Sequence, residues 1–229
     1  MLLSLLIPTI TSRQRLFSIL FETLKLQILA SRWASEVEVL FELDSGEVSI
    51  GQKRNILLGR ATGQFIAFID DDDEVSADYV ERICSAIVRR PEIDCIGIRG
   101  IITFQGSHPK EFIYSLRYTD VFSRNHTYFR PPYHLNPTRR EIAAPYRFLD
   151  VNYSEDFDWA QQIRRDGALK NEEFIDSVLY YYRSRRAWSY QWLLDFTEGF
   201  RHRFGIRLTN RFVVQNAIRS ISKKTDTPN

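Results

Sequence analysis

The sequence has few cysteines and no long apolar run, the features that would indicate a zinc-binding, disulfide-rich or membrane-spanning protein. It contains only two cysteines, Cys84 and Cys95, whose number and spacing fit neither a zinc site nor a disulfide framework. No stretch approaches the roughly 20 apolar residues of a membrane-spanning helix. The apolar run at 2–7 is too short for a signal peptide and is followed by Pro8. These absences predict a cytoplasmic protein that is not integral to a membrane.

The composition is that of an ordinary globular protein with an uneven charge distribution. Hydrophobic residues make up 44% of the 229 positions, charged residues 26% and aromatic residues 14%, enough for one large domain with a sizeable core. Residues 183–229 contain ten Lys/Arg and three Asp/Glu, a net charge of +7, whereas the preceding 182 residues carry −5. This basic segment suggests contact with an anionic membrane surface or nucleic acid, and a solubilising surface explains it equally well.

The order of apolar segments indicates an α/β fold. Strands are predicted at residues 2–7, 37–43, 65–69, 94–98, 100–104 and 174–182. Helices are predicted at about residues 12–28, 50–60, 77–89, 155–166 and 188–204. The first strand is expected to end at Pro8. Alternating strands and helices are typical of a parallel sheet covered by helices.

Two later segments differ from this regular pattern. From Ser107 to Tyr146 prolines interrupt the periodicity, which predicts irregular binding loops or lids. The helix predicted at 188–204 places four aromatic residues on one face, namely Trp188, Trp192, Phe196 and Phe200. Packing against the sheet and contact with lipid both explain such a stripe.

Four consecutive carboxylates, Asp70–Asp73, directly follow the apolar segment at 65–69. Adjacent like charges repel one another and cannot be buried without a compensating cation. At the carboxyl end of a strand in an open α/β sheet they would face the ligand crevice, where their oxygens suit Mg²⁺ or Mn²⁺. One alternative is a solvated acidic turn with Asp73 or Ser76 capping the next helix. Another is the D-x-D-x-V nucleophile loop of haloacid dehalogenase-type phosphatases at 71–75, although that family carries this loop after its first strand.

Two more acidic positions fall at predicted element ends. Asp44 precedes Ser45-Gly46, where the backbone must turn sharply. The pair Glu155-Asp156 opens a helix after Ser154. Acids in a first helical turn also favour the helix dipole, and Ser is a good cap, so ordinary capping explains this pair as well.

Basic residues complement these acids at two predicted helix starts. Lys53 and Arg54 follow Gly51 in a loop-to-helix position that suits phosphate, and Arg13 opens the first helix. Each alone is more often a solvated charge. Together with a metal on a neighbouring strand end, they would surround a diphosphate with positive charge.

Five motifs in order resemble the family 2 glycosyltransferases of the GT-A fold. They are residues 5–9 with Arg13, residues 38–46, residues 53–55, residues 61–73 and residues 154–160. The similarity covers roughly residues 2–183, and its specificity comes from the order of all five motifs. The resemblance implies an α/β fold, a single GT-A domain with a mostly parallel central sheet flanked by helices. That domain would span 1–183, with a nucleotide-sugar-binding part at 1–106 and an acceptor-side part at 107–183. Residues 184–229 would form a basic helical C-terminal extension.

The activity that the resemblance implies is inverting, Mn²⁺- or Mg²⁺-dependent transfer of a sugar from a nucleotide-diphosphate sugar, usually UDP-linked, to a hydroxyl of a glycan or related acceptor. The implied donor and nucleotide contacts are Pro8, Thr9, Arg13, Asp44, Lys53, Arg54, Asp70 and Asp71. The implied metal ligands are Asp72 and Asp70, and the implied general base is Asp156, supported by Glu155. Since four aspartates are consecutive, the metal register is open by one residue, and Asp71 and Asp73 remain candidates. His134 is a candidate donor or metal contact, with a structural histidine as the alternative.

Two other functions remain open from the sequence. One is a glycosyltransferase acting on a modified DNA base, with the basic C-terminal segment contacting phosphates. The other is a non-catalytic nucleotide-sugar-binding module, against which the combination of metal and base candidates argues.

Overall fold

The computed structural model describes residues 1–184, so the predicted helix at 188–204, its aromatic face and most of the basic segment lie outside the described residues. The predicted boundary between a GT-A domain at 1–183 and a C-terminal extension at 184–229 stays a prediction. The strands are β1 (Leu3–Ile10), β2 (Val37–Asp44), β3 (Phe65–Phe68), β4 (Glu74–Val75), β5 (Cys95–Phe104), β6 (Ser107–Tyr114), β7 (Phe122–Arg124), β8 (Thr127–Arg130), β9 (Thr138–Arg139) and β10 (Glu172–Ser184). The helices are α1 (Gln14–Ala30), α2 (Ile50–Arg60), α3 (Tyr79–Arg89), α4 (Arg140–Ala143) and α5 (Glu155–Arg165). None of these helices has the length and apolar character needed to cross a bilayer.

The described strands form one mixed sheet in the order β2-β1-β3-β9-β5-β6-β8-β7, with β10 paired to both β5 and β4. Strand β1 runs parallel to β2 and β3, β5 runs parallel to β10, and β6 runs parallel to β8. Short β9 joins the two halves by antiparallel pairing with β3 and β5. The predicted α/β fold with a central sheet flanked by helices is confirmed.

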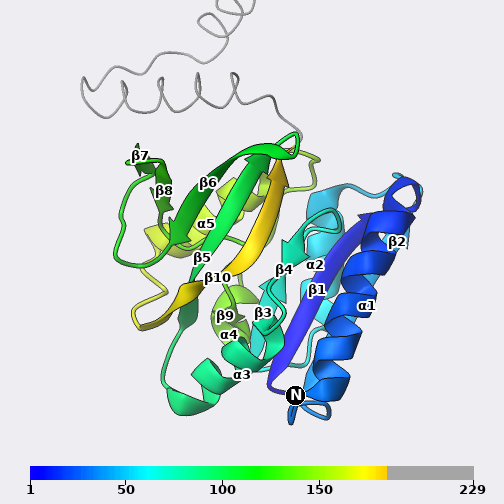
Figure 1. Ribbon diagram of the computed structural model, residues 1–229, viewed down its shortest axis with the longest axis horizontal. Helices are drawn as coiled ribbons and strands as arrows, with labels where there is room; N and C mark the ends of the chain where they lie inside the picture. The colour runs from blue at the N-terminus through cyan, green and yellow to red at the C-terminus, as the bar shows by residue number, and fades with distance from the viewer. Residues whose placement is uncertain (185–229) are drawn as a thin grey trace, which may run out of the picture. The chain divides into compact units, whose positions relative to one another are not determined.

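Helices lie on both faces of the central strands (Figure 1). Successive side chains of these strands point to opposite faces and so reach both helix layers. One face of β1 and β3 packs against α1 and α3 through Leu3, Leu5, Ile7, Phe65, Ala67 and Ile69. The other face packs against α2, α4 and α5 through Leu6, Ile66 and Phe68. Because both faces are covered, these strands are continuously apolar, and their carboxyl ends are left as the place where polar groups can gather.

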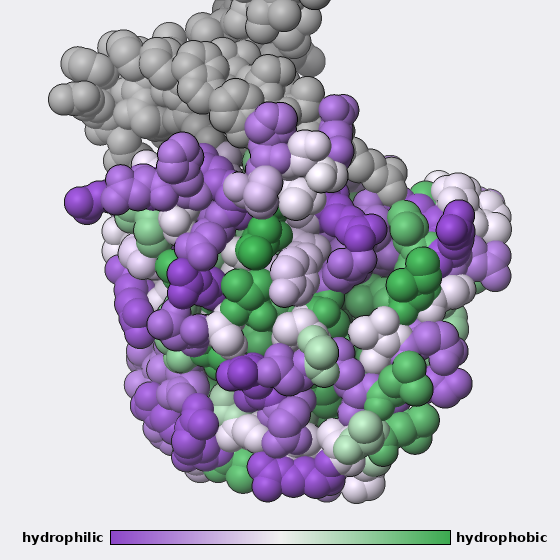
Figure 2. All heavy atoms as spheres, viewed as in Figure 1, coloured by the Kyte–Doolittle hydropathy of each residue, from purple (hydrophilic) through white to green (hydrophobic). Residues whose placement is uncertain are grey.

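Helix α1 contacts the sheet through one stripe of side chains. Its buried residues are Phe17, Leu20, Leu24 and Ile28, spaced by three or four positions as an amphipathic helix requires. The opposite side of α1 exposes Ile19, Leu26 and Leu29. On the face shown in Figure 2, apolar side chains are interspersed with polar ones, so the visible surface has a mixed character.

The prediction that Pro8 ends the first strand is wrong, because β1 continues to Ile10. The carbonyl of Leu6 accepts a hydrogen bond from Ile69 N, so the backbone polar groups of Leu6 point toward β3. Pro8 is two residues further along the strand, and its backbone therefore faces the same side. Strand β3 ends at Phe68, opposite Leu6, and requires no N–H from Pro8. A proline is therefore tolerated in this otherwise central strand.

Two further expectations for the middle of the chain are corrected. The strands predicted at 94–98 and 100–104 are one strand, β5, because Gly100 pairs with both β6 and β10. A Cβ at Gly100 would lie only 2.1 Å from the ring of Phe112. The segment 107–146, expected to be irregular, contains four strands and a short helix. Pro109 lies in β6 beside a register shift in the pairing with β5 and before the pairing with β8 begins, so it breaks no regular ladder.

A carboxylate ties the start of β1 to β2 and to the loop after α2. Glu38 accepts hydrogen bonds from Ser4 Oγ (2.6 Å), Thr62 N (2.7 Å) and Thr62 Oγ1 (2.8 Å). Burial raises the pKa of Glu38, but these hydrogen bonds lower it more, so its pKa lies below the ordinary value of 4.5. The ionised form thus stabilises the fold.

We expect Glu38→Gln to lower the free energy of unfolding at pH 7 by about 0.5–1 kcal/mol, allowing for the partial exposure of this carboxylate. Because the folded pKa is below the unfolded one, the contribution is complete above pH 4.5 and is lost as the pH falls through the folded pKa. Urea titrations of both proteins from pH 7 to pH 3 measure this. A difference that persists unchanged at pH 3 would contradict the assignment.

Candidate functional site

The carboxyl ends of β1, β2 and β3 meet at one edge of the sheet and bring several predicted site residues together. Asp71, directly after β3, is 1% exposed. It accepts hydrogen bonds from Thr9 Oγ1 and from Arg13 Nη1, both at 2.8 Å. Asp71 therefore joins the acidic loop to the end of β1, and Pro8 lies in β1 beside these groups.

Asp73 is also turned inward and is 4% exposed. It accepts hydrogen bonds from Tyr180 Oη (2.8 Å) and from the backbone N–H of Arg183 (2.7 Å), both on β10. Burial and the nearby charge of Asp70 raise the pKa of Asp73 well above its ordinary value. This burial contradicts the alternative of a solvated acidic turn. Nor does Asp73 or Ser76 cap α3, since the residue before that helix is Asp78.

Asp70 and Asp72 are only partly buried, with side chains 19% and 17% exposed. Asp70 accepts a hydrogen bond from Arg54 Nη2 at 2.8 Å. Burial would raise the pKa of Asp70, but Arg54 and His134 hold it far below the ordinary value. Asp72 lies 3.6 Å from Arg13 Nη1. It also lines a cavity of about 300 Å³ with Leu16, Gln105, Gly106, Arg183 and Ser184.

Asp44 and Lys53 form an ion pair where β2 ends. The Asp44 carboxylate also accepts from the N–H groups of Gly46 (3.0 Å) and Val48 (2.6 Å), which fixes the turn after the strand. Burial raises the pKa of Asp44, but Lys53 and the two backbone donors outweigh burial and lower it. Lys53 is buried and donates a second bond to the carbonyl of Thr9 at 2.6 Å.

The start of α2 does not present free N–H groups to a phosphate, contrary to the prediction. Ile50 N donates to Asn152 Oδ1 (3.0 Å), Gly51 N to Val151 O (3.2 Å) and Gln52 N to Ser49 Oγ (3.1 Å). Lys53 is engaged as described above, and the side chain of Arg54 is 2% exposed. The basic pair thus lies inside the protein rather than on a phosphate-binding surface.

Arg54 connects the acidic loop to the acid pair on α5. Its Nη2 contacts Asp70, its Nη1 lies 3.8 Å from Glu155 Oε1, and its guanidinium lies 5.6 Å from the ring centroids of both Phe68 and Phe148. Burial raises the pKa of Glu155, although Arg54 opposes this. A buried guanidinium thereby brings the carboxylates of β3 and α5 close together.

His134 forms a second connection between the same two regions. It is 3% exposed, with Nε2 3.5 Å from Asp70 Oδ2 and Nδ1 3.4 Å from Asp156 Oδ2. Burial and Arg54 lower the pKa of His134, which favours the neutral imidazole. Burial would raise the pKa of Asp156, but His134, Arg54 and a hydrogen bond from Tyr133 lower it. Asp156 is therefore ionised at neutral pH.

Three contributors to the site were not predicted from the sequence. Tyr180 holds Asp73 and also accepts a bond from Asp70 N at 3.1 Å. Tyr133 contacts Asp156, and Asn152 binds the start of α2. Only Tyr133 could have been found from the local sequence, because it is adjacent to His134. Tyr180 and Asn152 contact residues about a hundred positions away in the sequence.

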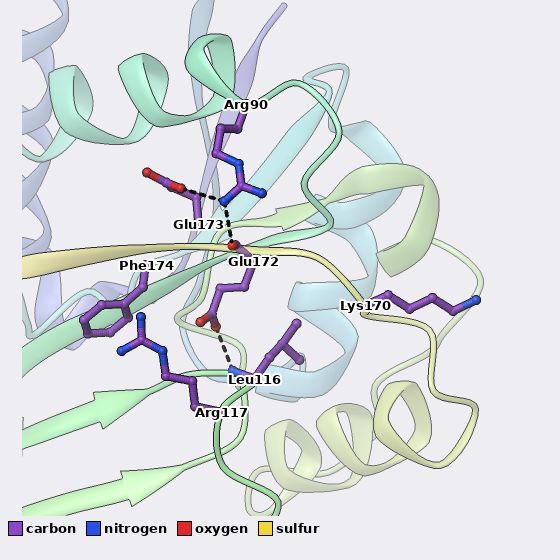
Figure 3. A pocket seen from close by; sticks show the side chains of 7 residues that line it. All are labelled: Arg90, Leu116, Arg117, Lys170, Glu172, Glu173 and Phe174. Atoms are coloured by element: carbon purple, nitrogen blue, oxygen red, sulfur yellow. Dashed lines mark hydrogen bonds and ion pairs between the residues drawn. The ribbon is translucent and has the colours of Figure 1, made fainter.

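A larger cavity, of about 460 Å³, contains none of the predicted site residues (Figure 3). Both of its carboxylates are already engaged: Glu172 accepts from Ser115 Oγ and Leu116 N, and Glu173 pairs with Arg89 and Arg90. The candidate site is therefore the strand-end cluster around Asp70, Asp72, Arg54, His134 and Asp156.

Comparison with known proteins agrees with this fold. Residues 40–147 match the family model of glycosyl transferase family 2. The structure of S. aureus TarS 1–349 in complex with UDP is similar with a TM-score of 0.63 and 15% identity, covering 93% of this chain and 75% of that one. TarS 1–349 in complex with UDP-GlcNAc matches with a TM-score of 0.58 and 15% identity over 82% of this chain, which spans 60% of the length of that one. No curated protein matches the sequence.

These comparisons identify the class first by fold and then by family. The structural similarity, at 15% identity, establishes the GT-A fold. The match of residues 40–147 to the model of glycosyl transferase family 2 supports the family that the sequence resembles.

We expect Arg54→Met to lower the free energy of unfolding by about 3–5 kcal/mol, because it leaves buried carboxylates without a compensating charge. Arg60→Met on the same helix is the matched control. Arg60 pairs with Glu42 at 2.9 Å, but its side chain is 50% exposed, so we expect a loss of at most about 1 kcal/mol. Chemical denaturation at pH 7 compares the two, and equal losses would refute the central charge role of Arg54.

Proposed function

We propose that the chain transfers a sugar from a UDP-linked sugar donor to a hydroxyl of a glycan or related acceptor, with inversion and with a divalent cation. The observation that carries this proposal is the meeting of Asp70 with Asp156 across Arg54 and His134, with Asp72 in the same loop beside Arg13. One carboxylate group serves the departing diphosphate, and the other serves the attacking hydroxyl.

The residues fit Mn²⁺ or Mg²⁺ in one arrangement. Within residues 1–184, no cluster of three or more His, Cys, Asp or Glu side chains forms a ready-made metal cage. Mg²⁺ is commonly bound by one or two carboxylates, with substrate phosphates and water supplying the other ligands. Asp72 lines the cavity and would be the direct ligand, with Asp70 as the second, whereas Asp71 and Asp73 are engaged inward. When bound, the cation would stabilise negative charge on the leaving diphosphate.

The donor side is proposed to use residues at the ends of β1 and β2. Arg13, with a side chain 30% exposed, is close to Asp72 and would approach the same phosphates. Asp44 would contact the base, and Pro8 and Thr9 would lie beside the nucleotide. Lys53 and Arg54 would act as internal charge partners instead of direct phosphate contacts. UDP is proposed because TarS was crystallised with UDP and UDP-GlcNAc.

Asp156 is proposed as the general base. Its lowered pKa keeps it ionised, so it can accept the proton of an acceptor hydroxyl that attacks the anomeric carbon. His134, whose ring nitrogens lie 3.4 Å from Asp156 and 3.5 Å from Asp70, would orient Asp156, and this role would replace the predicted role of His134 as a direct donor or metal contact. A single displacement from the face opposite the leaving group inverts the configuration.

Binding of the donor and cation is tested by a thermal-shift screen of UDP, GDP and their sugars with and without Mn²⁺. We expect UDP compounds to stabilise the protein in the presence of Mn²⁺, by about 2.7 kcal/mol at a ligand concentration 100 times Kd. Asp72→Asn should remove the Mn²⁺-dependent part of this stabilisation. Asp78→Asn, an exposed acid paired with Arg82, is the control and should retain it. Equal metal dependence in both variants would move the metal site elsewhere.

We expect Asp156→Asn to lower the transfer rate by about 10²–10⁴-fold, the usual contribution of a positioned base, while UDP binding is retained. Asp158→Asn is the control on the same helix, because Asp158 contacts Gln162 and not the site. UDP release from a UDP-sugar, followed with and without candidate acceptors, measures the rates. A near-normal rate for Asp156→Asn would exclude this residue as the base.

A further inference from the structure

The loop before α5 is attached along the first two turns of α2. Phe148 exchanges two hydrogen bonds with the side chain of Asn55, at 2.8 and 3.0 Å. Asp150 accepts from Ser49 Oγ at 2.5 Å. The bonds from Ile50 N to Asn152 and from Gly51 N to Val151 continue the series. We call this set of contacts, Ser49–Gly51 and Asn55 with Phe148–Asn152, the clasp.

Gly51 allows the two backbones to approach this closely. A Cβ at position 51 would lie 1.8 Å from the carbonyl oxygen of Leu149, a distance that requires the loop to move. At Gly59, on the same helix, a Cβ would have no other atom within 4 Å. The two glycines thus offer the same substitution in a blocked and an open environment.

The clasp leads directly into the acid pair, and α5 lacks its own side-chain cap. Ser154, the residue before the helix, has a left-handed backbone (φ 66°) and its side chain makes no capping hydrogen bond, which argues against ordinary capping by Ser154 as the explanation of the acid pair. Other contacts must therefore fix the direction in which Glu155 and Asp156 leave the loop. The clasp attaches this loop to α2, which also carries Arg54, 3.8 Å from Glu155.

We propose that the clasp positions Asp156 relative to the donor side of the site, with Gly51 and Asn152 as positioning residues. Helix α2 would then both carry Arg54, the charge partner of Asp70, and fix the position of Asp156, the proposed base. The catalytic consequence rests on the proposed glycosyltransferase function, whereas the attachment of residues 148–157 to α2 does not. Misplacing a catalytic group by about 1 Å can reduce a rate by about 10²-fold.

The test uses the full chain with UDP-GlcNAc and Mn²⁺, measuring UDP release and the Kd for UDP. We expect Asn152→Ala to lower kcat by about 10- to 100-fold with Kd unchanged. Asn152→Asp, which keeps an acceptor for Ile50 N, should restore most of kcat. Glu38→Gln, a destabilising change outside the clasp, controls for stability alone and should keep the wild-type kcat. A folded Asn152→Ala protein with wild-type kcat overturns the proposal.

Hydrogen exchange separates failure of the clasp from failure of the proposed function. We expect Gly51→Ala to lose protection across residues 148–157, and Gly59→Ala to keep it. If the wild-type protein neither binds UDP nor releases it from UDP-GlcNAc, the proposed function fails. The attachment of the loop to α2 is then tested by hydrogen exchange alone, and unchanged protection in Gly51→Ala would overturn it.

Discussion

The buried guanidinium of Arg54 is the interaction on which the site depends. Carboxylates from β3 and from α5 approach one another in the interior, where their mutual repulsion and desolvation would otherwise drive protonation or separation. Arginine remains charged in such an environment, whereas a buried lysine readily loses its proton. Burial lowers the pKa of Arg54, but Asp70, Asp156 and Glu155 outweigh it and raise the pKa. Asp70 of the acidic loop and Asp156 of the acid pair can therefore be neighbours and still ionise.

This arrangement favours function over maximal stability. In the described part of the chain, Arg54 Nε and Nη1 and both ring nitrogens of His134 are buried without an aligned hydrogen bond. Arg54 Nη1 interacts with Glu155 by charge at 3.8 Å, and the ring nitrogens of His134 lie 3.4 Å from Asp156 and 3.5 Å from Asp70 without short directional bonds. Buried polar groups of this kind are uncommon and tend to occur where a protein does chemistry.

The sequence predicted elements whose signal is local and missed those that depend on distant partners. Helix α2 has the predicted bounds of 50–60, because its periodicity and its Ser49 cap are local. The strands within 107–146 were missed since their pairing with β5 and with one another overrides their prolines. Likewise the motifs identified Asp70, Arg54 and Asp156 as one site. That the start of α2 is occupied by Val151 and Asn152 could not be predicted, because those residues lie about a hundred positions further along the chain.

Four adjacent aspartates are tolerated because each meets a different environment. Asp71 is neutralised by Arg13, Asp70 by Arg54, and Asp73 has a raised pKa that favours its protonated form. The two inward residues attach the loop to opposite neighbours, β1 through Thr9 and β10 through Tyr180. These four residues form a turn, closed by the bond from Asp73 N to the carbonyl of Asp70 at 3.1 Å, and with positions 71 and 73 held inward the side chains of Asp70 and Asp72 stay partly exposed. Two members of the acidic run, Asp71 and Asp73, thus hold in place the loop that carries the other two.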